Sequence, residues 1–251
     1  LNVGLYISLF PQLIAGPIVR YQTVAEQIKE RKETYSDFVE GVKRFAIGFI
    51  KKVFIANNVA IVADAAFNQP QDELSVSMAW LGALAYTFQI FLDFSGYSDM
   101  AIGLGPMFGF KFLENFNYPY ISKSVSEFWR RWHISLGEWF RDYVYFPMGG
   151  SKVNSTLRLL FNLFVVWLLT GIWHGANWTF IVWGLLYLAL IAVENITKFQ
   201  KEFKDSNYIK PLYVILLTAF GWVLFTSLNI STAFASMVTF LTLNFNTLDN
   251  L

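Results

Sequence analysis

The sequence predicts an all-α fold: a polytopic transmembrane helical bundle with interfacial and re-entrant helices. Of its 251 residues, 55% are hydrophobic and only 15% are charged, whereas a soluble domain carries about 25% charged residues. Residues 74–92 contain no charge over 19 positions, and residues 159–193 contain none over 35. About 20 apolar residues are enough for one helix to cross a bilayer. These lengths exclude a water-soluble globule.

The N-terminal part of the chain mixes apolar and basic residues. Residues 1–19 are uncharged but contain Pro11 and Pro17, and no charged region precedes them, so they do not form a signal peptide. We expect an internal piece of a longer protein, with residues 1–251 forming a single membrane-embedded core that lacks N-terminal helices. Residues 20–52 combine recurring lysines with an apolar helical pattern, which predicts a helix lying at or entering the interface. Residues 53–63 continue it inward.

The predicted crossings follow the uncharged stretches. Residues 74–92 form one crossing, which the polar run 93–99 interrupts. Residues 159–193 are long enough for two crossings joined by a tight hairpin. Residues 211–229 form another crossing, and residues 231–248 re-enter the membrane or begin a further span.

The basic residues divide the chain into sides. All 19 Lys and Arg residues lie in three segments, 20–52, 111–158 and 198–210, and the turns between the predicted crossings have none. The predicted spans bring these segments to one face, which the positive-inside rule assigns to the cytoplasm. We therefore expect a multi-pass protein of a bacterial inner (plasma) membrane, in contact with lipid.

Several kinds of chemistry are excluded by composition. A net charge of +1 gives no basic field for nucleic acid. The chain has no cysteine and only two histidines, which makes a zinc site improbable, so no metal is expected. It contains no G-x-S-x-G, H-E-x-x-H or P-loop motif. Proton transfer by histidine remains, without a bound cofactor.

His174 lies near the middle of the uncharged stretch 159–193. Residues 159–173 span about 22 Å of helix, which places His174 at membrane depth. An imidazole there can accept a proton from a substrate hydroxyl. It can equally hydrogen-bond a neighbouring helix and do nothing else, although ionisable groups inside a membrane are usually functional.

His133 lies on the apolar side of a predicted amphipathic helix, with Trp129, Trp132, Leu136 and Phe140 at helical spacing. An interfacial helix with an aromatic belt explains most of these residues. It does not explain why the polar residue on that face is a histidine.

Asp93 and Asp99 are embedded between apolar runs. Two interpretations are open: an ion pair with basic residues across the bundle, or the lining of a polar passage. We favour the ion pair.

Several motifs, in order along the chain, resemble the membrane-bound O-acyltransferase family. They are residues 92–103 (LDFSGYSDMAIG), 114–120 (ENFNYPY), 127–142, 145–150 and 169–178. Within that family, the chain is most similar to the bacterial branch that O-acetylates alginate. The D-alanyl transferases of teichoic acid synthesis are more distant.

The resemblance covers residues 10–194, with its motif region at 92–178, and it implies acyl transfer inside the membrane. It implies that His174, of the W-H-G motif, is catalytic and that His133, of the R-W-H-I-S-L motif, lines the same tunnel. We expect further tunnel residues at Asp93, Asp99, Asn117, Tyr120, Trp129, Trp173 and Asn177.

The substrates follow from the same resemblance. The donor would be acetyl-CoA or an acyl-carrier thioester reached from the cytoplasm. The acceptor would be the hydroxyl of an exported polysaccharide, or an extracytoplasmic acetyl-relay protein. Intramembrane Asp and His residues also suit a proton-coupled transporter, and a non-catalytic scaffold of a polysaccharide export complex is a third hypothesis.

Overall fold

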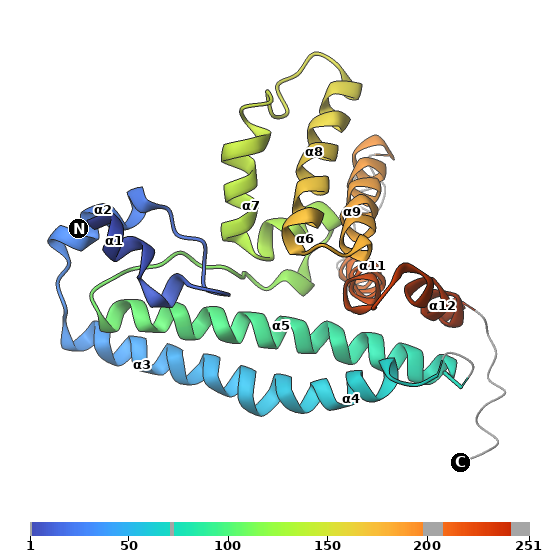
Figure 1. Cartoon of the computed structure of the whole chain (residues 1–251), viewed down its shortest axis with the longest axis horizontal. Coiled ribbons are helices and arrows are strands. Elements are labelled where there is room, and N and C mark those ends of the chain that lie inside the picture. The colour runs from blue at the N-terminus through green and yellow to red at the C-terminus, as the bar shows by residue number, and fades with distance from the viewer. Residues whose placement is uncertain (1, 71–72, 198–207, 242–251) are drawn as a thin grey trace.

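The computed structural model confirms the all-α fold class. It describes residues 2–70, 73–197 and 208–241, and every regular element there is a helix (Figure 1). Five helical stretches within these ranges are long and apolar enough to cross a membrane. In chain order, the elements are α1 (Asn2–Ile7), η1 (Phe10–Gln12), α2 (Tyr21–Glu30), α3 (Tyr35–Phe49), η2 (Ile50–Ala56), α4 (Asn57–Phe67), α5 (Val76–Met107), η3 (Pro119–Ile121), α6 (Val125–Arg131), α7 (Ile134–Phe140), η4 (Arg141–Tyr145), α8 (Thr156–His174), α9 (Trp178–Thr197), α11 (Ile209–Thr226) and α12 (Ile230–Leu241).

Two long antiparallel helices form the base of the molecule in Figure 1. The first runs through α3, the π-helical η2 and α4 as one stretch, Tyr35–Phe67, and the second is α5. Glycines bring the two backbones together: a Cβ on Gly48 would lie 2.5 Å from the carbonyl oxygen of Gly96, and one on Gly41 would lie 2.5 Å from that of Gly103. Small residues at a helix crossing are typical of packing in membranes.

The predicted interruption after residue 92 is wrong, because α5 continues unbroken through both of its aspartates. Asp93 pairs with Lys52, and Asp99 pairs with Lys51 at 2.6 Å and with Arg44 at 2.8 Å. The bases come from the first long helix. Since they neutralise the carboxylates inside the protein, the polar segment does not need to leave the helix.

The sequence had predicted one helix over the basic segment 20–52, but the structure divides this segment. It breaks between α2 and α3, where the Thr34 hydroxyl caps α3 by accepting the Asp37 N–H at 3.1 Å. The predicted helical continuation through residues 53–63 is confirmed by η2 and α4.

The predicted hairpin within residues 159–193 is confirmed by α8 and α9, which stand across the long pair in Figure 1. A Cβ on Gly171 would lie 2.6 Å from the Phe180 carbonyl oxygen, and one on Gly184 would lie 2.5 Å from that of Trp167. The crossing predicted at 211–229 corresponds to α11. α12 covers the start of the stretch 231–248, and residues 198–207 and 242–248 lie outside the described ranges.

The amphipathic helix predicted around His133 is divided into α6 and α7. At His133 the backbone leaves the direction of α6, because the Ile134 N–H donates to the Asn115 carbonyl at 2.9 Å instead of to a carbonyl of the preceding turn. The expected burial holds on both sides of the break, since Trp132, His133, Leu136 and Phe140 are all buried.

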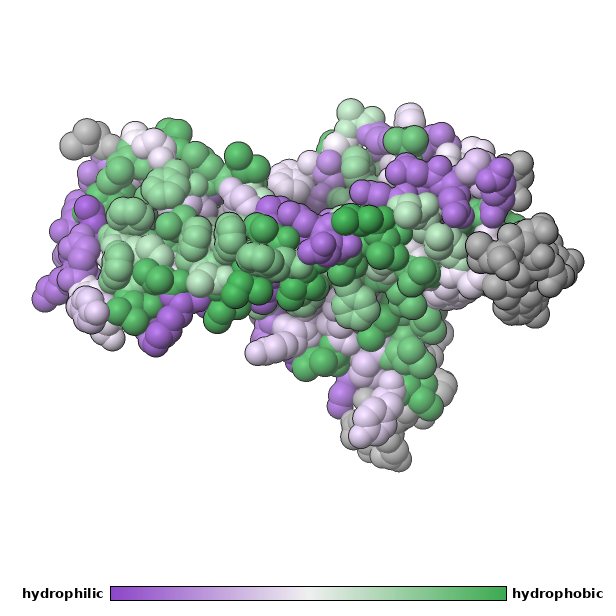
Figure 2. Space-filling model, turned by 90° about the horizontal axis from the view of Figure 1, so that it is seen from below, coloured by the Kyte–Doolittle hydropathy of each residue, from purple (hydrophilic) through white to green (hydrophobic). Residues whose placement is uncertain are grey.

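The remaining surface is rich in hydrophobic side chains. Figure 2 shows broad hydrophobic areas, with hydrophilic groups between them, on the face seen from below. Along the first long helix, Phe54 is 62% exposed and Ile61 is 66% exposed. A soluble monomer rarely exposes apolar surface on this scale, so these side chains suit contact with lipid.

Candidate active site

His174 is the last residue of α8, at the turn into α9. Gly175 follows with a φ of 152°, and a Cβ there would lie 2.8 Å from the Phe180 ring, so glycine permits the tight turn. The imidazole centroid lies 5.0 Å from that of Trp183 and 5.1 Å from that of Phe225. The end of a long apolar helix thus places a histidine among aromatic rings.

His133 lies between α6 and α7 and is only 6% exposed. Its φ of 46° is left-handed, a conformation that costs a residue with a side chain about 1–3 kcal/mol and persists only where its surroundings hold it. Its Nδ1 lies 3.2 Å from Oδ1 of Asn115, and its ring meets the Phe94 ring edge-on at 4.7 Å. Burial lowers the pKa of His133 to about 3, so the ring is neutral at pH 7.

The two histidines line the same cavity, although 41 residues separate them in sequence. This cavity, which we call the histidine cavity, has a volume of about 500 Å³. Trp173 also lines it, with its ring centroid 5.9 Å from that of His133 and 4.9 Å from that of His174. Both histidines also line a smaller apolar space of about 120 Å³, together with Trp129 and Thr170. The pair therefore borders two spaces.

The histidine cavity contains one ion pair. Asp93 of α5 lines it together with Lys52, and the two side chains are bonded to each other. Asp93 therefore forms an ion pair and also lines a cavity, so both interpretations of its position in the sequence apply. The pair adds polar groups to a largely aromatic wall without adding net charge.

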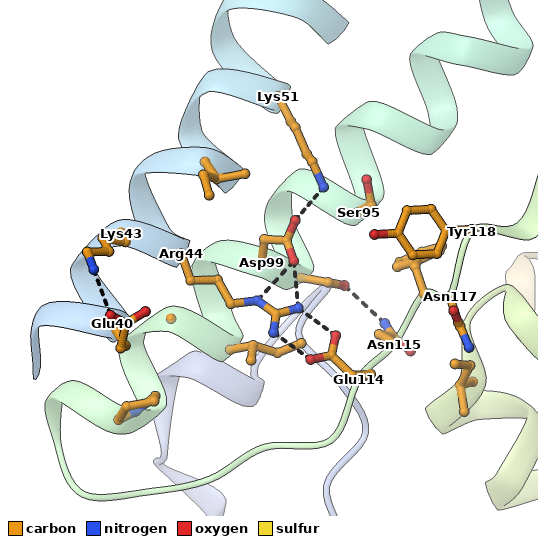
Figure 3. Close-up of a pocket in the computed structure, with 18 of the residues that line it drawn as sticks. Glu40, Lys43, Arg44, Lys51, Ser95, Asp99, Glu114, Asn115, Asn117 and Tyr118 are labelled. Atoms are coloured by element: carbon orange, nitrogen blue, oxygen red, sulfur yellow. Dashed lines mark hydrogen bonds and ion pairs between the residues drawn. The ribbon is translucent and has the colours of Figure 1, made fainter. Parts of the chain in front are cut away.

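A second space, the charged cavity, lies between α3, α5 and the segment of residues 114–118, and its volume is about 890 Å³. In Figure 3, Arg44 reaches across it to Asp99 and Glu114. Asn117 also lines this cavity, and neither histidine does. The structure therefore separates Asp99 and Asn117 from the two histidines, which the sequence had grouped in one tunnel.

Tyr120 and Asn177 line neither the histidine cavity nor the charged cavity. The Tyr120 hydroxyl donates to the Thr87 carbonyl at 2.7 Å, and burial raises the pKa of this phenol. The Asn177 amide donates to the Leu228 carbonyl at 2.9 Å and accepts the Thr179 N–H at 3.1 Å, which fixes the hairpin turn. In this structure both side chains have structural partners.

The sequence did not single out four residues that shape the site. Asn115 holds His133, Ser135 holds Asn115, and Trp183 and Phe225 enclose His174. Asn115 and Ser135 lie within the motifs quoted above. They are polar residues among aromatic and apolar ones, and this pattern could have identified them from the sequence. Within the described ranges, no cluster of His, Asp and Glu could hold a metal ion.

The fold and the site define a class: a polytopic helical membrane protein with two histidines at one internal cavity. A sequence profile of the membrane-bound O-acyltransferase family matches residues 1–243, and the chain belongs to that family.

Named relatives cover most of this chain. A probable alginate O-acetylase, AlgI, of Azotobacter vinelandii is 48% identical over 94% of the chain and 47% of its own length. A peptidoglycan O-acetyltransferase of Helicobacter pylori is 40% identical over 93% of the chain and 45% of its own length. A teichoic acid D-alanyltransferase of Bacillus subtilis is 33% identical over 88% of the chain and 60% of its own length. The chain thus spans about half the length of the first two relatives.

Proposed function

We propose that this chain forms the histidine-bearing core of a bacterial membrane O-acyltransferase. The enzyme would move an acetyl or similar acyl group from a cytoplasmic thioester, acetyl-CoA or an acyl carrier, to a hydroxyl group. The acceptor would be an exported cell-surface polysaccharide or a relay protein that passes the group on. The observation that carries the proposal is the convergence of His133 and His174 on one cavity.

The chemistry needs a base, two access routes and protection from water. His174 would take the proton of the acceptor hydroxyl while its oxygen attacks the thioester carbonyl. The C–O bond forms, the C–S bond breaks, and the proton passes from His174 to the leaving thiolate. General-base catalysis of this kind contributes about 10²–10⁴-fold. The two spaces that both histidines line would hold donor and acceptor.

His133 would orient the acceptor or stabilise the charge that develops during attack. Its ring is neutral and buried, so it can exchange a hydrogen bond with a polar substrate without introducing a charge. Asn117 and Tyr120, which the sequence placed in the tunnel, do not line the histidine cavity, so we assign them no part in this step. The names of the relatives support acyl transfer to cell-surface polymers.

We also propose that the three basic segments lie at the cytoplasmic face of the bacterial plasma membrane. The support for this placement is the grouping of all 19 basic residues into three segments. On that face they would meet the anionic groups of a coenzyme A or carrier-protein donor.

The test is His174→Ala in the full-length protein, assayed with purified enzyme and acetyl-thioester donors. We expect thioester consumption and polymer acetylation to fall about 10²–10⁴-fold. Leu157→Ala is the matched control, because Leu157 is 78% exposed at the opposite end of α8. Unchanged acetylation by the His174→Ala protein at normal abundance would contradict the role of His174. Absence of any thioester turnover by the wild type would favour a transporter or a scaffold.

A further inference from the structure

We infer that Asn115 is a positioning residue for His133: it holds the ring with Nδ1 protonated and leaves Nε2 as the acceptor nitrogen for the histidine cavity. The use of that nitrogen in acyl transfer depends on the proposed function. The hydrogen-bond arrangement itself does not, and it can be tested separately.

The orientation of the Asn115 amide is determined by its other partners. Oδ1 accepts the Ser135 backbone N–H at 3.2 Å and the Ser135 hydroxyl at 2.9 Å. The Ser135 oxygen in turn accepts the Ile18 N–H at 3.0 Å, which directs the hydroxyl proton toward Asn115. On the other side, Nδ2 donates to the Ser98 hydroxyl at 3.0 Å. An amide turned by 180° would place its NH₂ group against the Ser135 backbone N–H, which can only donate, and would lose that bond.

This orientation determines the tautomer of His133. Nδ1 lies 3.2 Å from Oδ1 of Asn115, and an amide oxygen carries no proton. Nδ1 must therefore carry the hydrogen and donate it. In a neutral imidazole the second nitrogen then has the free lone pair, so Nε2 is the nitrogen that can accept a hydrogen bond from a substrate.

The network is shielded from water. Asn115 is fully buried, and Ser98, Ser135 and His133 are 1%, 4% and 6% exposed. A second bond joins the same two segments, from the Ile134 N–H to the Asn115 carbonyl at 2.9 Å. One residue thus holds both the ring and the left-handed backbone of His133.

Asn115 also forms part of the wall of the charged cavity. Figure 3 shows its bond to α5 from that side, next to the ion pairs that Arg44 makes with Asp99 and with Glu114, the residue before Asn115. These ion pairs tie the segment carrying Asn115 to α3 and α5. The charged cavity therefore borders the segment that contacts His133, although no histidine lines it.

The first experiment measures the tautomer directly. The full-length protein labelled with ¹⁵N-histidine is examined by NMR, and the His133 signals are assigned with a His133→Gln variant. Two-bond couplings from the ring carbons' protons show which nitrogen is protonated. We expect hydrogen on Nδ1 of His133 in the wild type. Hydrogen on Nε2 would overturn the inference, whether or not the protein shows acyltransferase activity.

The second experiment introduces a carboxylate with the shape of the amide, Asn115→Asp. A carboxylate beside Nδ1–H favours the charged ring and raises the pKa of a histidine by about 1–3 units. We expect the acid limb of the kcat profile to move to higher pH relative to wild type. The other titratable groups lining the cavity, His174, Asp93, Tyr97 and Lys52, are the same in both proteins.

Two controls separate this effect from lost packing or added charge. Ser98→Ala removes the acceptor of Nδ2 and should leave the acid limb in place. Asn154→Asp makes the same change of charge at an exposed position before α8, outside the membrane-crossing stretches, and should also leave it in place.

A third variant, Asn115→Leu, removes the acceptor altogether. We expect kcat to fall about 10–100-fold, the range seen when a residue that orients a functional histidine is removed, with KM little changed. If this variant does not fold, Asn115→Asp still decides the question. An acid limb unmoved in a folded Asn115→Asp protein would contradict the inference.

Discussion

The two long helices and the bundle that contains the two histidines (α6, α8 and α9) differ in the polar side chains that they hold inside the protein. Where the two long helices cross, Arg44 and Lys51 form ion pairs with Asp99 and Glu114. Beside α6, α8 and α9, His133 and His174 lie among aromatic rings and have no ion-pair partner in the part of the chain that the structure describes. Removing one partner of a buried ion pair destabilises a fold, whereas a base without an ion-pair partner at a cavity is available for chemistry. Substitutions should therefore separate stability from activity.

The largest effect on the fold is expected for Gly48→Val. A Cβ at Gly48 would lie 2.5 Å from the backbone oxygen of Gly96, so the two long helices must move apart. Overpacking of this kind costs about 3 kcal/mol or more when the backbone cannot yield. We expect a strong loss of folded protein, measured by size-exclusion chromatography and thermal unfolding in detergent. Gly4→Val is the control, because a Cβ at Gly4 would meet nothing within 4 Å. Equal behaviour of the two variants would show that the crossing is not tightly packed.

A smaller loss of stability is expected for Asp99→Asn. The side chain of Asp99 is 13% exposed and neutralises two bases that are themselves about one-third exposed. Partial exposure reduces the penalty for the bases left behind, to about 1–3 kcal/mol. The melting temperature should fall, and the turnover per folded molecule should change much less.

The control for Asp99→Asn is Glu40→Gln. Glu40 pairs with Lys43 at 2.7 Å, but both side chains are more than 60% exposed. Its loss should cost at most about 0.5 kcal/mol. If both variants lower the melting temperature equally, the α3–α5 ion pairs are no more important than surface pairs.

A third effect concerns the dependence of stability on pH. An unfolded histidine titrates near pH 6.5, whereas the pKa of folded His133 is about 3. Between these values the unfolded state binds a proton that the folded state does not. The contribution of His133 to stability is therefore complete above pH 6.5 and is lost as the pH falls toward 3, by at most about 1.4 kcal/mol per pH unit.

His133→Gln tests this dependence. The difference in melting temperature between wild type and variant should narrow as the pH is lowered from 7 to 4. Parallel curves over that range would mean that His133 does not stay neutral in the folded protein. Leu157→Ala, measured in the same buffers, should give a constant difference.

The sequence predicted the bundle helices well and the long helices poorly. The stretch 159–193 becomes α8 and α9 because its length and lack of charge already specify a hairpin of two crossings. The continuity of α5 depends on Lys51 and Lys52, more than 40 residues earlier. Hydropathy along one segment contains no information about such partners.

The candidate site shows the same limit. His133 and His174 were both identified from the sequence and do line one cavity. The left-handed turn at His133 was missed, because helical spacing continues through it and only the distant Asn115 explains the break. Asp99 and Asn117 were grouped with the histidines because they lie within the same motif region, but the structure puts them at the charged cavity. Which residues face one another is decided by tertiary contacts that spacing does not reveal.

The central claim is that His133 and His174 act together at one cavity to transfer an acyl group. The most direct test compares kcat/KM for thioester consumption in His133→Gln, His174→Gln and the double variant of the full-length protein. Residues that act as a unit give non-additive losses, so we predict that the double variant is about as active as the weaker single variant. Losses that multiply, or single variants with wild-type turnover, would contradict the claim.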